Sequence, residues 1–147
     1  MPSLTIDTKF HGSCVIQEEQ VLHFRYPMIG FERLRQFILM PFDVDRKMFV
    51  LQSVDEAAIA FFLADPAEAF PTYAVPDGAV PKTFPGTAET RIMGVVLVPS
   101  KSGWTANLRA PVLIDRTTRI GGQIPLKDPL NFREPWPDEL PQKAATV

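Results

Sequence analysis

Short runs in which apolar and polar residues alternate dominate this chain. In the first of them Leu4, Ile6 and Phe10 alternate with polar residues, which is typical of a β-strand with one face in water. Similar runs recur between turn residues at intervals of about 8 to 12 residues, a spacing that favours an antiparallel barrel or sandwich. After a first strand at residues 4–8, they predict strands at residues 14–16, 21–24, 38–41, 49–54, 59–63, 92–98, 106–108, 112–114 and 123–126. The expected fold is all-β, a small and mainly antiparallel barrel.

Helical structure is expected only as short turns. One is predicted at residues 31–37 and another at residues 67–70, where Asp65 would cap the turn and Pro66 would fill its first position. Residues 66–86 hold five prolines, and this density excludes a long regular element there.

The end of the chain differs from the rest in composition. Four prolines follow Leu126 and are expected to prevent regular strand pairing. We therefore expect a barrel domain at residues 1–128 and a proline-rich, partly disordered tail at residues 129–147, with residues 142–147 disordered. Phe132 and Trp136 lie in this tail, and such large aromatic side chains are expected to dock on the barrel or on a partner.

The segment at residues 105–123, TANLRAPVLIDRTTRIGGQ, joins two predicted strands through Ala110 and Pro111. Because proline donates no backbone hydrogen bond and fixes one φ angle, this junction is expected at the rim of the barrel and not inside a central strand. Gly121 and Gly122 are predicted to form the next turn, with positive φ angles.

Length and composition narrow the class of protein. A chain of 147 residues is one ordinary domain, which buries roughly 70% of the surface that its unfolded form exposes. No apolar run approaches the ~20 residues of a membrane span, and no signal-peptide pattern is present, so we expect a soluble cytoplasmic protein without membrane contact. One cysteine and two histidines form neither an internal disulfide nor a closed zinc site, so no metal or cofactor is expected.

The charge pattern argues against nucleic-acid binding. The net charge is −2, and the Lys and Arg residues are scattered along the chain. Binding to a phosphate backbone requires a basic stripe, so direct contact with RNA or DNA is not expected. A mildly acidic surface is compatible with a basic protein partner.

Catalytic chemistry has little support. His11, Ser13 and Cys14 lie close together in the sequence and invite a nucleophile interpretation. Adjacent residues of a strand point to opposite faces, however, and the G-x-S-x-G elbow of hydrolases is absent. Gly121 and Gly122 also lack the context of a phosphate-binding loop. We predict that the protein is not an enzyme.

The residues expected to bind a partner are those that look out of place on a simple barrel. Strand alternation buries only one of Phe61 and Phe62 in one core, so the other should face outward or join a second cluster. The alternative is structural: the aromatic residues pack in the core, an asparagine caps a bulge, and the arginines are solvated. The candidates are Phe62, Asp65, Pro66, Phe70, Tyr73, Asn107, Arg109, Arg119 and Gln123.

Five short segments, in this order along residues 8–126, resemble the FliW family of flagellar assembly factors. They are TKFHG at 8–12, IGFE at 29–32 after Phe24, FVLQSV at 49–54, ADP at 64–66, and NLRAP at 107–111 with GGQ at 121–123. The resemblance implies a small β-barrel without catalytic activity that binds flagellin and the RNA-binding translational regulator CsrA. It implies that the protein antagonises CsrA from an allosteric site and so relieves repression of flagellin translation.

The chain departs from the family pattern after the FPTY segment at residues 70–73. Many relatives carry acidic residues there, whereas residues 74–89 contain only Asp77 and Glu89 with Lys82, so attraction to a basic CsrA should be weaker. Alternatives are a PilZ-like ligand-binding barrel, an OB-like nucleic-acid binder or another small protein-interaction module. The D/N-x-S-x-x-G turn of the first and the interleaved basic and aromatic residues of the second are absent.

Overall fold

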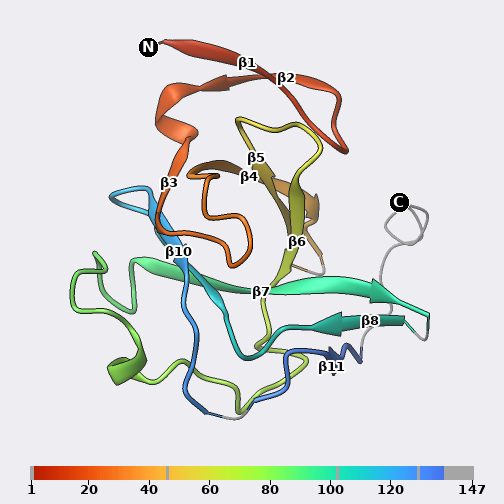
Figure 1. The fold of residues 1–147 in the computed structure, drawn as a ribbon, viewed down its shortest axis with the longest axis vertical. Coiled ribbons are helices and arrows are strands. Elements are labelled where there is room, and N and C mark those ends of the chain that lie inside the picture. Colours follow the sequence, from red (N-terminus) through yellow and green to blue (C-terminus); the bar gives the residue numbers. More distant parts are fainter. Residues whose placement is uncertain (1, 46, 102, 129, 138–147) are drawn as a thin grey trace.

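The computed structural model describes residues 2–45, 47–101, 103–128 and 130–137, and within them the chain is all-β (Figure 1). The two helices found there are single 3-10 turns, and neither has the length and apolar character needed to cross a membrane. The elements are β1 (Ser3–Asp7), β2 (Ser13–Gln17), η1 (Glu18–Gln20), β3 (Leu22–Tyr26), β4 (Gln36–Asp43), β5 (Met48–Ser53), β6 (Ala60–Ala64), η2 (Asp77–Ala79), β7 (Arg91–Ser100), β8 (Gly103–Ala106), β9 (Val112–Asp115), β10 (Ile120–Gln123) and β11 (Glu134–Pro135).

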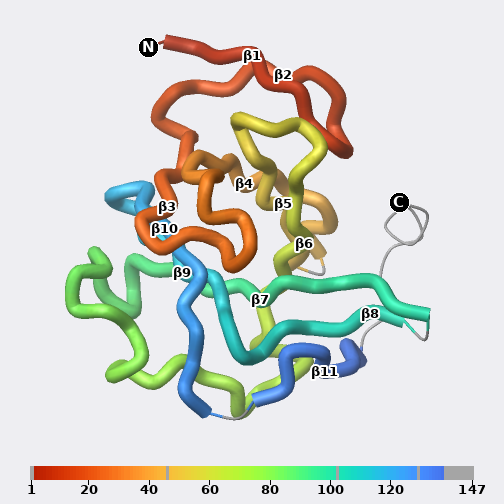
Figure 2. Tube along the Cα trace, viewed as in Figure 1, coloured from red at the N-terminus to blue at the C-terminus, as the bar shows by residue number. Residues whose placement is uncertain are grey.

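Seven strands close into a barrel in the order β7-β6-β5-β4-β3-β10-β9, because β9 also pairs with β7. All neighbours in this ring are antiparallel except β10 and β3, which are parallel. The hairpin of β1 and β2 forms a separate two-stranded sheet at one end of the molecule (Figure 2). The predicted all-β, mainly antiparallel barrel is confirmed.

The long strand β7 belongs to the barrel at one end only. Its residues 91–94 pair with β9, whereas residues 97–100 pair with β8. The β7–β8 ribbon therefore runs out past the barrel, and β11 lies along the outer edge of β8 (Figure 1). This ribbon places side chains of the second half of β7 at the rim of the barrel.

Strand alternation divides the core into two main clusters. The interior cluster combines residues from around the whole ring, including Phe24, Phe37 and Leu63, and so fills the barrel. The outer cluster lies on the other face of β5, β6 and β7 and includes Phe62. Phe61 instead packs its ring against Phe31 and Phe37 of the interior cluster. The prediction that Phe61 and Phe62 serve different clusters is confirmed.

Gly121 and Gly122 lie inside strand β10, so the prediction of a turn there is wrong. The turn comes earlier, at residues 116–119, and Arg119 holds its positive φ of 63°. A Cβ atom on Gly121 would lie 2.6 Å from Cε1 of Phe24, and one on Gly122 would lie 2.6 Å from Cβ of Tyr26. Glycine is required because the parallel strand β3 approaches this closely, and not because of backbone conformation.

Three other predicted elements differ most from the observed ones. The helical turn predicted at 31–37 is replaced by reverse turns, in which the N–H groups of Phe31 and Leu34 each bond to the carbonyl three residues earlier, and β4 already begins at Gln36. The strand predicted at 106–108 is β8, which ends at Ala106, and the strand predicted at 123–126 is β10, which ends at Gln123.

The tail contains one short paired strand, which contradicts the prediction that its prolines exclude pairing. In β11, Glu134 and Pro135 pair with Ala106 and Thr105 of β8. Proline is tolerated here because β11 is the last strand of the sheet and its free edge needs no donor. The predicted disorder of residues 142–147 lies outside the described part of the chain.

The fully buried side chain of Gln52 ties the N-terminal hairpin to the barrel. Its Oε1 accepts a hydrogen bond from the N–H of Lys9 at 2.9 Å. Its Nε2 donates to the carbonyl oxygens of Ser53, Ala57 and Ile59. A single glutamine thus satisfies backbone groups of two separate loops, which gives the FVLQSV segment a structural role.

Asp115, at the end of β9, is a fully buried carboxylate. Its Oδ2 accepts hydrogen bonds from the hydroxyl of Thr118 at 2.6 Å and the N–H of Thr118 at 2.9 Å, and its Oδ1 accepts one from the hydroxyl of Thr90 at 2.6 Å. These bonds, that from the Thr118 hydroxyl first, hold the pKa of Asp115 below its ordinary value of 3.8 in spite of burial.

We expect Asp115→Asn to lower the free energy of unfolding by about 1–3 kcal/mol, because the amide nitrogen would face a donor. The carboxyl has a lower pKa in the folded chain than in the unfolded chain. Its contribution is therefore complete above pH 3.8 and is lost as the pH falls through the folded value. Urea unfolding between about pH 7 and pH 3 measures both effects, with the exposed Asp77→Asn as control. An equally steep acid loss in Asp115→Asn would contradict this role.

Candidate functional site

Two hollows join into one groove where the β7–β8 ribbon leaves the barrel. Their volumes are about 230 Å³ and about 280 Å³, and both are lined by Phe61, Val96 and Val98. We call the joined surface the rim groove. Its further lining residues are Lys9, Phe10, Ala60, Phe62, Leu97, Pro99 and Trp104 in the first hollow, and Met28, Ile29, Asn107, Gln123, Phe132 and Arg133 in the second.

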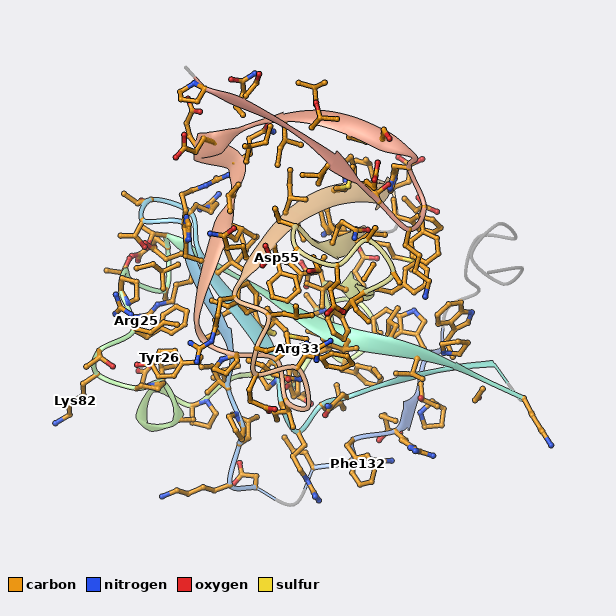
Figure 3. All side chains as sticks on the ribbon, turned by 45° about the horizontal axis from the view of Figure 1, so that its top comes forward. Arg25, Tyr26, Arg33, Asp55, Lys82 and Phe132 are labelled. Atoms are coloured by element: carbon orange, nitrogen blue, oxygen red, sulfur yellow. The ribbon has the colours of Figure 1, made fainter. Side chains whose placement is uncertain are left out.

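Three large apolar side chains of the second hollow are mostly open to solvent. Ile29 is 57% exposed, Val98 51% and Phe132 53%. They come from the β3–β4 loop, from β7 and from the tail, and Phe132 lies at the lower edge of the molecule in Figure 3. Apolar side chains from three separate segments that meet around a groove are typical of a protein-docking surface.

Gln123 holds the loop that carries Ile29 against the barrel. Its side chain is 6% exposed, and its Oε1 accepts a hydrogen bond from the N–H of Ile29 at 2.8 Å. Its Nε2 donates to the carbonyl oxygen of Ala110 at 3.0 Å. Gln123 of the GGQ segment therefore fixes the backbone on two sides of the rim groove. Its contribution to binding a partner stays a prediction.

Asn107 turns the chain between β8 and Pro111. Its Oδ1 accepts hydrogen bonds from the N–H groups of Arg109 at 3.0 Å and Ala110 at 3.2 Å. This is the capping role that the sequence offers as its alternative interpretation. The half-buried side chain of Asn107 also lines the second hollow, so contact with a partner remains open to it.

Phe62 lies under the first hollow at the centre of an aromatic group. It is 8% exposed, and its ring lies 5.1 Å from that of Phe10 and 5.3 Å from those of Phe42 and Trp104. Replacing Phe62 would therefore disturb core packing and any bound partner together. A substitution at the exposed Val98 separates an effect on partner binding from an effect on core packing better.

Arg109 fixes the tail at the groove. Its Nε donates to the carbonyl oxygen of Leu130 at 3.0 Å, and its guanidinium lies 5.4 Å from the ring centre of Phe132. The N–H of Leu108 bonds to the carbonyl oxygen of Asn131 at 3.0 Å. The tail thus lies against the barrel, with Trp136 packed on the outer cluster and Phe132 at the second hollow, which is one of the two dockings that the sequence predicts.

Phe70 and Tyr73 support the same tail from the outer cluster. The ring of Phe70 meets Trp136 edge-on at 5.7 Å, and the hydroxyl of Tyr73 donates to the carbonyl oxygen of Leu108 at 2.6 Å. Burial raises the pKa of Tyr73 to about 12, so its hydroxyl stays a neutral donor at physiological pH. Both residues lie beneath the tail, and their part in binding a partner stays a prediction.

The other three candidates lie away from the rim groove. Asp65 accepts a hydrogen bond from the N–H of Ala67 at 2.9 Å, and the carbonyl of Pro66 accepts one from Phe70, which gives the turn predicted at 67–70. Arg119 belongs to the β9–β10 turn. Asp65 and Arg119 border hollows at the other end of the barrel.

Residues 5–136 match the family model described as FliW protein. The chain belongs to the FliW family. This confirms the resemblance drawn from five short segments, and the match extends past both ends of them. FliW-family proteins are non-enzymatic flagellar assembly factors, in agreement with the prediction that the chain is not an enzyme.

Individual members of the FliW family match most of the chain. The flagellar assembly factor FliW of Syntrophotalea carbinolica is 36% identical over 137 residues, which cover 90% of this chain and 97% of that protein. The FliW protein of Geobacillus kaustophilus is 33% identical over 125 residues, covering 82% and 86%. A crystal structure of the flagellar assembly factor FliW has a TM-score of 0.77 at 28% identity and covers 93% of this chain and all of that one. The barrel is therefore a FliW-like fold.

The site residues predicted from the sequence of this FliW-family chain do not include the exposed apolar side chains of the groove, Ile29, Val98 and Phe132. Ile29 stands in the IGFE segment, and its apolar side chain beside Gly30 was a usable signal for an exposed loop tip. Val98 gave no signal, because its exposure depends on β7 leaving the barrel. Phe132 was predicted to dock, and its outer half stays open.

The edges of the rim groove are basic in spite of the net negative charge of the chain. Lys9 and Arg133 line it, Arg109 lies beside it over Phe132, and none of its described lining residues is acidic. The groove thus favours a partner segment that buries apolar side chains and carries carboxylates at its margins.

The residues that suggested a nucleophile are engaged in other bonds. The hydroxyl of Ser13 donates to the carboxylate of Asp7 at 2.6 Å, and the thiol of Cys14 points to the backbone carbonyl oxygen of His11 at 3.4 Å. Neither bond is to the imidazole of His11, so the hairpin does not assemble a nucleophile and base.

Proposed function

We propose that this FliW-family protein binds flagellin and CsrA in the cytoplasm and antagonises CsrA, which relieves repression of flagellin translation. The observation that carries the proposal is the match of residues 5–136 to the FliW family, supported by the fold similarity over 93% of the chain. The protein acts by binding, without a cofactor and without direct contact to RNA.

The rim groove is the proposed docking surface for these partners. It joins two apolar hollows and is bordered by Ile29, Val98 and Phe132, each more than half exposed. Residues of this kind lose much solvent contact when a partner covers them, which makes them candidates for binding hot spots. Gln123 fixes the loop that carries Ile29, and Arg109 fixes the tail that carries Phe132. Asn107 fixes the turn that carries Arg109.

Use of one groove by both partners accounts for switching between them. If flagellin and CsrA cannot occupy the groove together, each lowers the apparent affinity of the protein for the other. Unexported flagellin then releases CsrA, and export of flagellin frees the protein to capture CsrA again. The concentration of unexported flagellin therefore sets, by mass action, how much CsrA is free to repress flagellin translation.

The groove is chemically unlike RNA. An RNA mimic would present acidic side chains to the basic face of an RNA-binding protein, whereas the described groove residues are apolar with basic edges. This supports antagonism of CsrA from a site separate from its RNA-binding face. Residues 74–89, with two acidic side chains, add little electrostatic attraction.

Isothermal titration of the full chain with CsrA, and separately with flagellin from the same organism, tests the proposal. We expect saturable binding to both, with titration curves whose inflection gives a defined stoichiometry. Binding to flagellin alone would reduce the function to that of a flagellin-binding chaperone. Absence of binding to either partner at tens of micromolar would refute the proposed function while leaving the fold family in place.

A further inference from the structure

A second apolar cavity opens at the end of the barrel opposite the rim groove. Its two parts have volumes of about 430 Å³ and about 240 Å³ and share Leu39, Ile92 and Ile114. These three side chains pack with the interior cluster, so the packed interior of the barrel forms the floor of the cavity. The rim groove uses the second half of β7, whereas this mouth cavity lies at its first residues, 91–94.

The smaller part of the mouth cavity is lined by Arg119, whose Nε is buried and has no hydrogen-bond partner among the described residues. Two other arginines of the cavity are already held. The guanidinium of Arg91 donates to three backbone carbonyls of residues 84–86, and that of Arg116 donates to those of Glu89 and Thr90. Arg119 is therefore the guanidinium that a bound anion would satisfy.

The backbone of Arg119 supports the same interpretation. Its φ of 63° lies in the left-handed region, which glycine and asparagine adopt far more readily than arginine. A tight turn between β9 and β10 would be built at lower cost with glycine. A strained residue whose Nε has no hydrogen-bond partner among the described residues, at a cavity mouth, is the arrangement expected of a ligand-binding side chain.

We propose that the mouth cavity binds a small amphiphile with an unbranched apolar chain and a carboxylate head, of the medium-chain fatty acid class. The chain lies against Leu39, Ile92 and Ile114, and the head pairs with Arg119. The larger part is bordered by Asp65 and by Lys47, whose ammonium already pairs with Glu68 at 3.6 Å. The head group is therefore directed to Arg119, in the smaller part. An apolar cavity of this size, with a cationic side chain placed to fix the orientation of the ligand, is typical of a small-molecule site.

The test uses the full chain and decanoate below its micellar concentration, with decan-1-ol as the uncharged probe. Arg119→Gly is the central variant, because glycine takes the positive φ without strain and is expected to preserve or raise Tm. Arg33→Gln, at an exposed arginine bonded to Glu56, is the control. Calorimetric titration is expected to show saturable decanoate binding, weakened about tenfold or more in Arg119→Gly and unchanged in Arg33→Gln.

Decan-1-ol should bind the wild type and Arg119→Gly equally, because it lacks the charge that the arginine recognises. The inference would be overturned by no saturable decanoate binding to the wild type. It would also be overturned by equal decanoate affinity in Arg119→Gly, or by wild-type affinity for decan-1-ol as high as for decanoate. None of these results bears on flagellin or CsrA, because the mouth cavity and the rim groove are at opposite ends of the barrel.

Discussion

Gly122→Ala is expected to lower the free energy of unfolding by about 2–4 kcal/mol. The added Cβ would lie 2.6 Å from Cβ of Tyr26 and 2.9 Å from its carbonyl oxygen. These are parts of strand β3, which cannot withdraw without loosening its parallel pairing with β10. That pairing helps close the ring, so the cost extends beyond a local contact.

Urea unfolding followed by far-UV circular dichroism measures this change in stability. Gly78→Ala is the matched control, because Gly78 is exposed and a Cβ there would meet no atom within 4 Å. We expect Gly78→Ala to remain within about 0.5 kcal/mol of the wild type. A Gly122→Ala variant as stable as Gly78→Ala would show that the close approach of β3 and β10 is not needed.

Val98→Glu is expected to weaken binding of flagellin and of CsrA about 30-fold or more, which corresponds to ~2 kcal/mol. Val98 is 51% exposed and lines both hollows of the rim groove. A carboxylate at this position is solvated in the free protein but would lose its water beneath a partner. Stability should therefore change little while affinity falls.

Val15→Glu provides the control for this variant. Val15 is a 70% exposed valine of strand β2, in the N-terminal hairpin and outside the groove lining. Titration of both variants with each partner separates the groove from a general effect of an added charge. Wild-type affinities of Val98→Glu for both partners would exclude the rim groove as the docking surface, and loss of one partner alone would assign the groove to that partner.

The local alternation of apolar and polar residues was enough to predict the strands. It was also enough to predict that Phe61 and Phe62 pack in different clusters. Alternation is a property of each strand by itself, so it can be followed in the sequence without knowing the neighbours. The same holds for the turn at 67–70, where Asp65 caps as predicted. The family resemblance added the barrel topology, which strand patterns alone do not specify.

Features that depend on distant segments were not predictable from local pattern. Gly121 and Gly122 look like turn residues in sequence, and only the approach of β3, about 95 residues earlier, explains them as strand residues. Gln123 looks like an exposed polar residue, yet its side chain holds the backbone of Ile29 and Ala110 at the rim. Val98 is exposed because β7 extends beyond the barrel to pair with β8. Its exposure can be predicted only when that pairing is known.

Competition calorimetry is the most direct test of the central claim, that one FliW-family protein switches between flagellin and CsrA. The protein is first saturated with flagellin and then titrated with CsrA, and the result is compared with the titration of the free protein. The account predicts that bound flagellin abolishes the CsrA signal or lowers its apparent affinity in proportion to the free flagellin concentration. Undiminished CsrA binding to the flagellin complex would contradict the switch.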